Sequence, residues 1–394
     1  MLGESITALV ALLFASLHIA TGIILCSLAM ILIGSVSLRL KGLCARAERS
    51  APCLLSPCPL VQKANCSMDR YASICPSVRV CETKKHVCNE KGQHPTMPRL
   101  KIGISLSTTG QIEGVKDRAR HVEQLGFDSL WVPDLINGDG TPSLESIVTL
   151  TTAAAVTDRV QLGFGVLVPY ARPIALLAAQ IVTLQYLSGN RLILGIGSGG
   201  PSDTPFSRAV GAVVRERGRR TDAALDILPH LIAGEATQLT GEPDQPVLTL
   251  APAVPVPPFL IGGSSDVAIR RAATRGFGWF PSLITPDALT RQAEKLRELA
   301  SEHGHATPGI TVGGHILLES EKAEHEAFLH NMVDNYGIPP ETAAKIPITG
   351  PRELVAERFA AYAEAGAERL VIALSAKKWM QKCELIKEAL DLLN

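Results

Sequence analysis

Residues 187–200 read LSGNRLILGIGSGG, and this stretch decides the fold class. An apolar run with helical spacing ends at Leu187, a polar turn follows, and Leu192–Ile196 is then apolar apart from one glycine. Such a short run of apolar, branched side chains is typical of a strand that is buried on both faces, as in parallel sheets. The glycine-rich turn Gly195–Gly200 follows it. The stretch therefore predicts a helix, a buried strand and a tight turn of a parallel α/β fold.

The same alternation continues from Leu100 to the C-terminus. The predicted strands are Lys101–Leu106, Ser129–Val132, Val160–Val168, Arg191–Ile196, Phe259–Ile261, Gly278–Phe280, Thr311–Leu318 and Leu370–Leu374. The predicted helices are Gly114–Leu125, Leu144–Val156, Ile174–Leu187, Arg217–Ile232, Asp266–Thr274, Asp287–Glu302, Glu353–Ala365 and Met380–Leu393. Eight strands that alternate with eight helices predict a (β/α)8 TIM barrel over residues 97–394. A doubly wound sheet is the alternative, disfavoured because no GxGxxG follows the first strand.

The first 96 residues differ from the rest of the chain. Ile6–Leu38 is almost uncharged and is longer than the roughly 18 apolar residues that can span a bilayer. No Lys or Arg precedes it and Arg39 and Lys41 follow, so the positive-inside rule would place the barrel in the cytoplasm. The next segment holds seven cysteines without a CxxC pair, so zinc is not expected: Cys44, Cys53, Cys58, Cys66, Cys75, Cys81 and Cys88.

Two interpretations of residues 1–96 stay open. In one, residues 1–40 are a transmembrane helix and residues 41–96 a disordered, cysteine-rich linker, which anchors the barrel to a membrane. In the other, the segment is spurious, Met97 is the true start and the barrel is simply cytoplasmic. Cys383 is the only cysteine after residue 96, which fits a reducing compartment. The formal net charge is zero, so no nucleic-acid partner is expected.

Two glycine-rich corners follow predicted strands and lead into helices or loops. One is Gly195–Gly200 and the other is Gly262–Ser265. Glycines there let backbone N–H groups point at an anion, and a helix N-terminus adds a favourable dipole. Tight turns alone are the alternative explanation for one such run. Two runs with serines at one barrel face predict a site for a phosphate-bearing cofactor.

Two stretches between the elements are predicted to be irregular. They are Ser198–Arg215, which lies at the face formed by the strand C-terminal ends, and Glu235–Pro258. The third predicted strand contains Gly163 and Gly165, and a glycine inside a strand often marks a bulge or the close approach of a ligand.

The sequence resembles the luciferase-like monooxygenase family across nearly all of residues 100–394. The matching segments are Leu125–Val132, Gly165–Pro169, Arg172-Pro173, Leu187–Gly199, Arg215–Arg220, Gly262–Asp266 and Gly278–Pro281. The resemblance implies a barrel that binds FMN or the deazaflavin coenzyme F420 at its C-terminal face. It also implies a third-strand bulge, often with a non-proline cis peptide, behind the cofactor ring. The residues that match these contacts are Gly165, Val166, Gly197, Ser198, Gly199, Gly262, Gly263, Ser264 and Ser265.

Two positions depart from the family pattern. Many members have His after the acid that ends the second strand, where this chain reads Asp134-Leu135. The related deazaflavin sugar-phosphate dehydrogenases have Glu after the fourth-strand glycines, where this chain has Gly200. Neither Leu nor Gly can transfer a proton, so that particular activity is disfavoured. Asp134 remains the catalytic candidate, with a helix or turn cap as the equally weighted alternative.

Other conspicuous residues have structural explanations. His315 is predicted to be a structural histidine, and Cys383 an inert buried thiol. Trp131 and Trp279 suit either a pocket wall or the core. Arg191 and the cluster Arg215–Arg220 are expected to form salt bridges and surface charges rather than phosphate clamps.

These observations predict an oxidoreductase that transfers a hydride between reduced F420 or FMN and a small organic substrate, or activates oxygen. F420 is preferred because Leu187–Gly199 and Arg215–Arg220 resemble the deazaflavin branch. The alternatives are an FMN-dependent monooxygenase, a non-catalytic flavin-binding protein, and a membrane-tethered protein in which residues 1–96 carry the function. A homodimer is expected, and no metal site.

Overall fold

The computed structural model describes residues 99–108, 112–200, 204–317, 321–375 and 377–393. The chain divides into two units, Met1–His94 and Pro95–Asn394, and the described residues belong to the second. The span predicted at Ile6–Leu38 and the cysteine-rich linker therefore lie outside the described residues. Within the described ranges, no helix combines the length and apolar character that crossing a membrane requires.

Eight parallel strands form one sheet, as predicted. They are β1 (Lys101–Ser105), β2 (Ser129–Val132), β3 (Gln161–Leu167), β4 (Leu192–Ile196), β7 (Phe259–Gly262), β8 (Gly278–Phe280), β9 (Thr311–Ile316) and β10 (Arg369–Leu374). The strand order is β8-β7-β4-β3-β2-β1-β10-β9. Parallel bridges join Trp279 to Ile310 and Ser282 to Gly313, which brings the two edge strands together. The sheet is therefore a nearly closed barrel, and the predicted fold class is confirmed.

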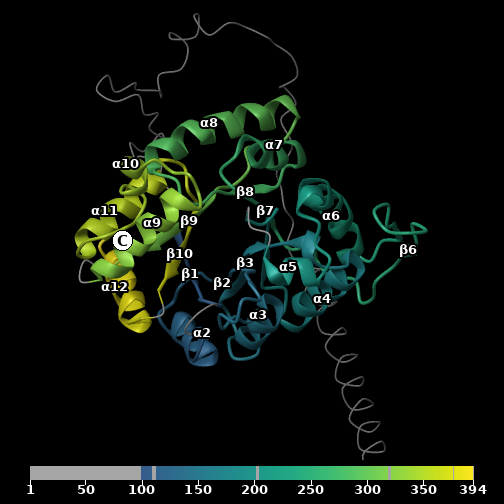
Figure 1. Ribbon diagram of the computed structural model, residues 1–394, viewed down its shortest axis with the longest axis horizontal. Coiled ribbons are helices and arrows are strands. Elements are labelled where there is room, and N and C mark those ends of the chain that lie inside the picture. The colour runs from purple at the N-terminus through teal and green to yellow at the C-terminus, as the bar shows by residue number, and fades with distance from the viewer. Residues whose placement is uncertain (1–98, 109–111, 201–203, 318–320, 376, 394) are drawn as a thin grey trace, which may run out of the picture. The chain divides into compact units, whose positions relative to one another are not determined.

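All eight predicted helices are present and surround the strands (Figure 1). They are α2 (Val115–Gln124), α3 (Ser146–Ala154), α4 (Ile174–Leu187), α6 (Arg217–Ile232), α7 (Asp266–Arg275), α8 (Pro286–Glu302), α11 (Arg352–Glu364) and α12 (Trp379–Asp391). Polar caps set several of their starts. The side chains of Ser265 and Thr285 accept hydrogen bonds from backbone N–H groups in the first turns of α7 and α8.

Several further elements were not predicted from the sequence. They are α5 (Pro205–Ala209), α9 (Lys322–Asp334), α10 (Pro340–Ala343), the 3-10 turns η2 (Pro169–Ala171) and η3 (Val214–Glu216), and the strands β5 (Thr237–Gln238) and β6 (Val247–Leu248). The prediction that Ser198–Arg215 and Glu235–Pro258 are irregular is therefore wrong in part. Short elements lack enough residues to show a period, and α9 has only Met332 buried, so it carries no apolar stripe.

Side chains fill the barrel interior below the strand C-terminal ends. Trp131 lies within an inner cluster with Ile193, Leu260, Phe280 and Val371, and its ring meets Phe280 edge-on at 5.3 Å between centroids. Glycines face the Trp131 indole from both neighbouring strands. A Cβ at Gly103 would lie 2.4 Å from the indole, and one at Gly163 would lie 2.2 Å from it. The Trp131 Nε1–H donates to Ser129 Oγ over 2.8 Å. Core packing, not a pocket wall, explains this tryptophan.

Candidate functional site

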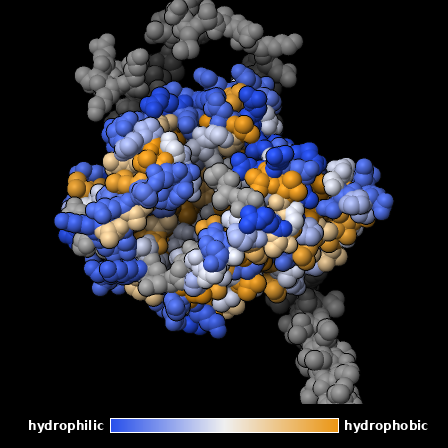
Figure 2. All heavy atoms as spheres, in the orientation of Figure 1, coloured by the Kyte–Doolittle hydropathy of each residue, from blue (hydrophilic) through white to orange (hydrophobic). Residues whose placement is uncertain are grey.

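The mouth of the barrel is the end of the lumen at the strand C-terminal ends, and lumen-facing residues there are partly exposed. On β9, Gly313 and His315 are partly exposed, whereas the residues on either side of them are buried. A Cβ at Gly313 would point toward Ser282 and Phe280, so this partly exposed face of β9 lines the lumen. Ala373 of β10 follows the same pattern. A hollow with apolar and polar side chains around it is visible near the middle of the barrel in Figure 2.

Val166 forms the centre of the floor of this mouth. The register of β3 against β4 shifts between Phe164 and Leu167, and the Gly165–Val166 peptide is cis, as the resemblance implied. The bulge points the Val166 side chain across the lumen. A Cβ at Gly197 would lie 2.4 Å from Val166 Cγ2, and one at Gly262 would lie 2.7 Å from Cγ1. The two predicted glycine corners therefore converge around one isopropyl group at one end of the barrel.

The corner after β4 holds fewer free donors than the sequence suggested. The Gly197 N–H donates to the carbonyl of Leu167 over 2.9 Å and continues the sheet. Gly199 has a positive φ of 69°, and a Cβ there would lie 3.2 Å from the Tyr170 ring. The backbone after Gly197, at Ser198 and Gly199, is thus the part of this corner that can approach an anion.

The corner after β7 also has fewer free hydrogen-bond donors than the sequence suggested. The Gly263 N–H donates to Phe280 O over 3.1 Å, and the Ser264 hydroxyl donates to Ser282 O over 2.7 Å. Ser265 Oγ accepts from Ala268 N, which leaves the Ser265 hydroxyl hydrogen unused by that bond. The start of α7 favours an anion through its dipole, and the carboxylate of Asp266 there is neutralised by Lys295 at 2.8 Å.

Asp134 lies at the rim with both carboxylate oxygens engaged. Oδ2 and Oδ1 accept from the Arg172 guanidinium over 2.6 and 2.8 Å. Oδ1 also accepts from Ser146 Oγ over 2.9 Å, and Oδ2 from the Val168 N–H over 3.0 Å. This pair is buried, with 6% of the Asp134 and 15% of the Arg172 side chain exposed. Asp134 therefore ties the end of β2 to the end of β3, and its lone pairs are occupied.

Arg172 is the centre of that network, and the sequence did not single it out as a site residue. It also pairs with Glu145 over 2.8 Å. Burial disfavours the charged guanidinium, but the hydrogen bonds and charges of Asp134 and Glu145 prevail and raise the pKa of Arg172. Its partners lie 38 and 27 residues away in sequence, so no local spacing could have revealed the cluster.

The remaining candidates are placed as follows. Arg191 donates to the carbonyls of Ala154, Thr157, Val160 and Ser188. Its role is therefore structural, but it bonds to backbone carbonyls where a salt bridge or a surface charge was expected.

In the arginine cluster, Arg219 pairs with Glu216, as expected for a surface charge. Arg217 donates to the carbonyl of Gly200. Arg220 donates to the carbonyl of Tyr170 and also pairs with Glu216 over 3.8 Å. Cys383 is buried, and burial raises the pKa of its thiol, which fits an inert residue.

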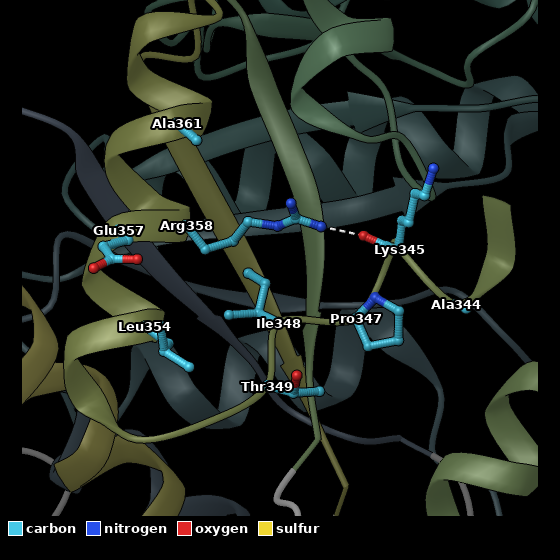
Figure 3. A pocket seen from close by; sticks show the side chains of 9 residues that line it. All are labelled: Ala344, Lys345, Pro347, Ile348, Thr349, Leu354, Glu357, Arg358 and Ala361. Carbon is cyan, nitrogen blue, oxygen red and sulfur yellow. Dashed lines mark hydrogen bonds between the residues drawn. The ribbon is translucent and has the colours of Figure 1, made fainter. Parts of the chain in front are cut away.

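A cavity of about 390 Å³ lies outside this mouth, between the segment 344–349 and α11 (Figure 3). Arg358 extends across it and donates to the carbonyl of Lys345. None of the predicted cofactor residues lines it. The mouth above Val166 is therefore the candidate functional site.

Comparisons with known proteins agree with this geometry. The family model described as luciferase-like monooxygenase matches residues 99–345. An uncharacterised protein of Mycobacterium tuberculosis is 34% identical over 234 residues, which are 52% of this chain and 80% of the relative.

Two solved structures share the fold. One is an F420-dependent secondary alcohol dehydrogenase in complex with an F420–acetone adduct, with a TM-score of 0.62 and 17% identity over 74% of this chain and 99% of that one. The other is the oxygenating constituent of 3,6-diketocamphane monooxygenase of Pseudomonas putida in complex with FMN. Its TM-score is 0.61, with 19% identity over 74% of this chain and 97% of that one. The family model, together with the bulged third strand and the two converging corners, shows that this chain belongs to the luciferase-like monooxygenase family.

Proposed function

We propose that the barrel is an oxidoreductase that binds coenzyme F420 or FMN in its mouth and transfers a hydride to or from a small organic substrate. The observation that carries the proposal is the position of Val166. The bulge of β3 places its side chain between Gly197 and Gly262, on top of the inner cluster. This arrangement makes an apolar floor, against which a planar ring system can pack.

The residues around this floor fit a phosphate-bearing cofactor. A side chain at Gly197 or Gly262 would collide with Val166, so both strand ends stay open to the mouth. Ser198, Gly199 and Ser265 would hold the phosphate, aided by the start of α7. The Asp134–Arg172 pair would keep the Val168 backbone, and with it the bulge, in place. The chemistry that such a cofactor supplies is hydride transfer or, with FMN, oxygen activation.

Two observations bear on the choice between the cofactors. F420 is preferred because of the resemblance of Leu187–Gly199 and Arg215–Arg220 to the deazaflavin branch. The two similar structures bind F420 in one case and FMN in the other. An FMN-dependent monooxygenase is therefore the second candidate.

A flavin-binding protein without catalytic activity is the third candidate. It is favoured by Leu135, which is 46% exposed at the rim and cannot transfer a proton, and by the fully engaged carboxylate of Asp134. The homodimer expected from the sequence stays a prediction.

A cofactor titration of the purified full chain tests the proposal. FMN and F420 are added separately, and quenching of their fluorescence is followed. We expect one of the two to bind with a dissociation constant in the micromolar range or below. Failure of both to bind would overturn the proposal. Steady-state reoxidation of the reduced cofactor then separates an enzyme from a carrier, because a carrier does not exceed the background rate.

A further inference from the structure

Among the described strand residues that face the mouth, one has a titratable side chain that the proposed function does not use. Among the strand residues that the structure describes, the lumen-facing positions near the C-terminal ends are Ser105, Gly165, Val166, Gly262, His315 and Ala373. Of these, His315 alone carries a group that can exchange a proton near neutral pH.

The direction of the His315 side chain follows from its neighbours on β9. Gly314 faces outward, because a Cβ there would meet Ile372 and Ile348. Gly313 faces the lumen, toward Phe280 of the inner cluster. Since side chains alternate along a strand, His315 projects into the lumen, one step nearer the mouth than Gly313. Its backbone carbonyl accepts from Ile348 N over 2.8 Å, which secures this end of β9.

The strand of His315 also lies across the lumen from the strand of Val166. In the order β8-β7-β4-β3-β2-β1-β10-β9, the strands β3 and β9 are separated by four steps in a ring of eight. Val166 and His315 therefore lie on strands at opposite sides of the lumen. The ring of Phe328, from α9, lies 5.1 Å from the imidazole centroid and covers part of it.

We infer that His315 is a ligand-contacting residue, which meets the face of the bound cofactor ring that Val166 does not cover and so borders the substrate position. This inference rests on the proposed function. Burial lowers the pKa of His315 to about 4, so the ring is neutral at neutral pH. A neutral imidazole donates one hydrogen bond and accepts another. It is therefore suited to bind a hydroxyl or carbonyl group, which the apolar side chain of Leu135, after β2, cannot do.

Carbethoxylation of histidines by diethyl pyrocarbonate tests this position without requiring a substrate. The full chain is labelled with and without saturating cofactor, and modified peptides are quantified by mass spectrometry. We expect bound cofactor to slow the labelling of His315 at least fivefold and to leave exposed His303, at the end of α8, unchanged.

Two variants complete the test. His315→Gln should abolish the assigned modification while it retains the far-ultraviolet circular dichroism of the wild type. Phe328→Ala should speed the labelling of His315 in the cofactor-free protein, because it uncovers the imidazole. Cofactor binding is measured in the same samples by fluorescence. If cofactor binds and His315 reacts at an unchanged rate, the inference is overturned while the proposed function stands. If neither FMN nor F420 binds, both are overturned.

Discussion

Replacing Asp134 by Asn probes the buried charge network that ties β2 to β3 at the mouth. The substitution keeps the shape of the side chain but removes the negative charge that faces Arg172 at 2.6 Å. Breaking a buried ion pair from one side costs about 3–5 kcal/mol, because the other charge stays buried without its partner. Glu145 still neutralises part of the Arg172 charge at 2.8 Å. We therefore expect the free energy of unfolding to fall by about 3 kcal/mol, near the lower end of that range.

Urea unfolding of the full chain, followed by circular dichroism at 222 nm, measures this loss. The matched control is Asp117→Asn, which breaks an ion pair with Arg120 in which both side chains are at least 50% exposed, and it should cost less than about 1 kcal/mol. The double variant Asp134→Asn/Arg172→Met should recover part of the stability, since no unpaired buried charge remains. Equal losses for Asp134→Asn and Asp117→Asn would refute the reasoning.

Three further predictions concern the core, a buried lysine and pH. Trp131→Ala empties the centre of the inner cluster and should lower the free energy of unfolding by about 4 kcal/mol in urea, whereas a loss below about 1 kcal/mol would contradict a filled lumen. Lys382→Met removes the fully buried cation 2.7 Å from Glu321 and should lower the free energy of unfolding by about 3 kcal/mol. The control Lys387→Met, in an exposed pair with Asp391, should lower it by less than about 1 kcal/mol. Similar losses in the two variants would argue against a buried ion pair. His315 has its pKa lowered by burial from 6.5 to about 4, so the unfolded chain binds a proton there that the folded chain does not. Its effect is absent above pH 6.5, and the free energy of unfolding falls as the pH drops from 6.5 to 4. The His315→Gln variant should show a shallower fall in thermal denaturation, and parallel curves would contradict the lowered pKa.

The fold was largely predictable because each strand and each long helix carries its own pattern. The runs at Leu192–Ile196 and Leu370–Leu374 are short and apolar, as central parallel strands are. Convergence of the two glycine corners was also predictable, because parallel strands present their C-terminal ends at one face of a barrel. In contrast, α9 is polar around most of its surface and is stabilised by tertiary contacts that a sequence pattern does not show.

The details of the site were less predictable because they depend on pairs far apart in sequence. Nothing near Asp134 indicates that Arg172 occupies its carboxylate. Likewise, the glycine pattern does not show that the Gly197 and Gly263 N–H groups already donate within the sheet. The lumen-facing direction of His315 follows from strand alternation only once the register of β9 is known.

The central claim, that Val166 is the floor on which the cofactor ring rests, is tested most directly by one pair of dissociation constants. Val166→Ala and Val148→Ala delete the same two methyl groups, the first under the proposed ring and the second on α3, where Val148 is 66% exposed. At about 0.8 kcal/mol for each buried group, the first change should weaken binding of the preferred cofactor roughly tenfold. The second should leave it within about twofold of the wild type. Equal affinities in the two variants would contradict the account.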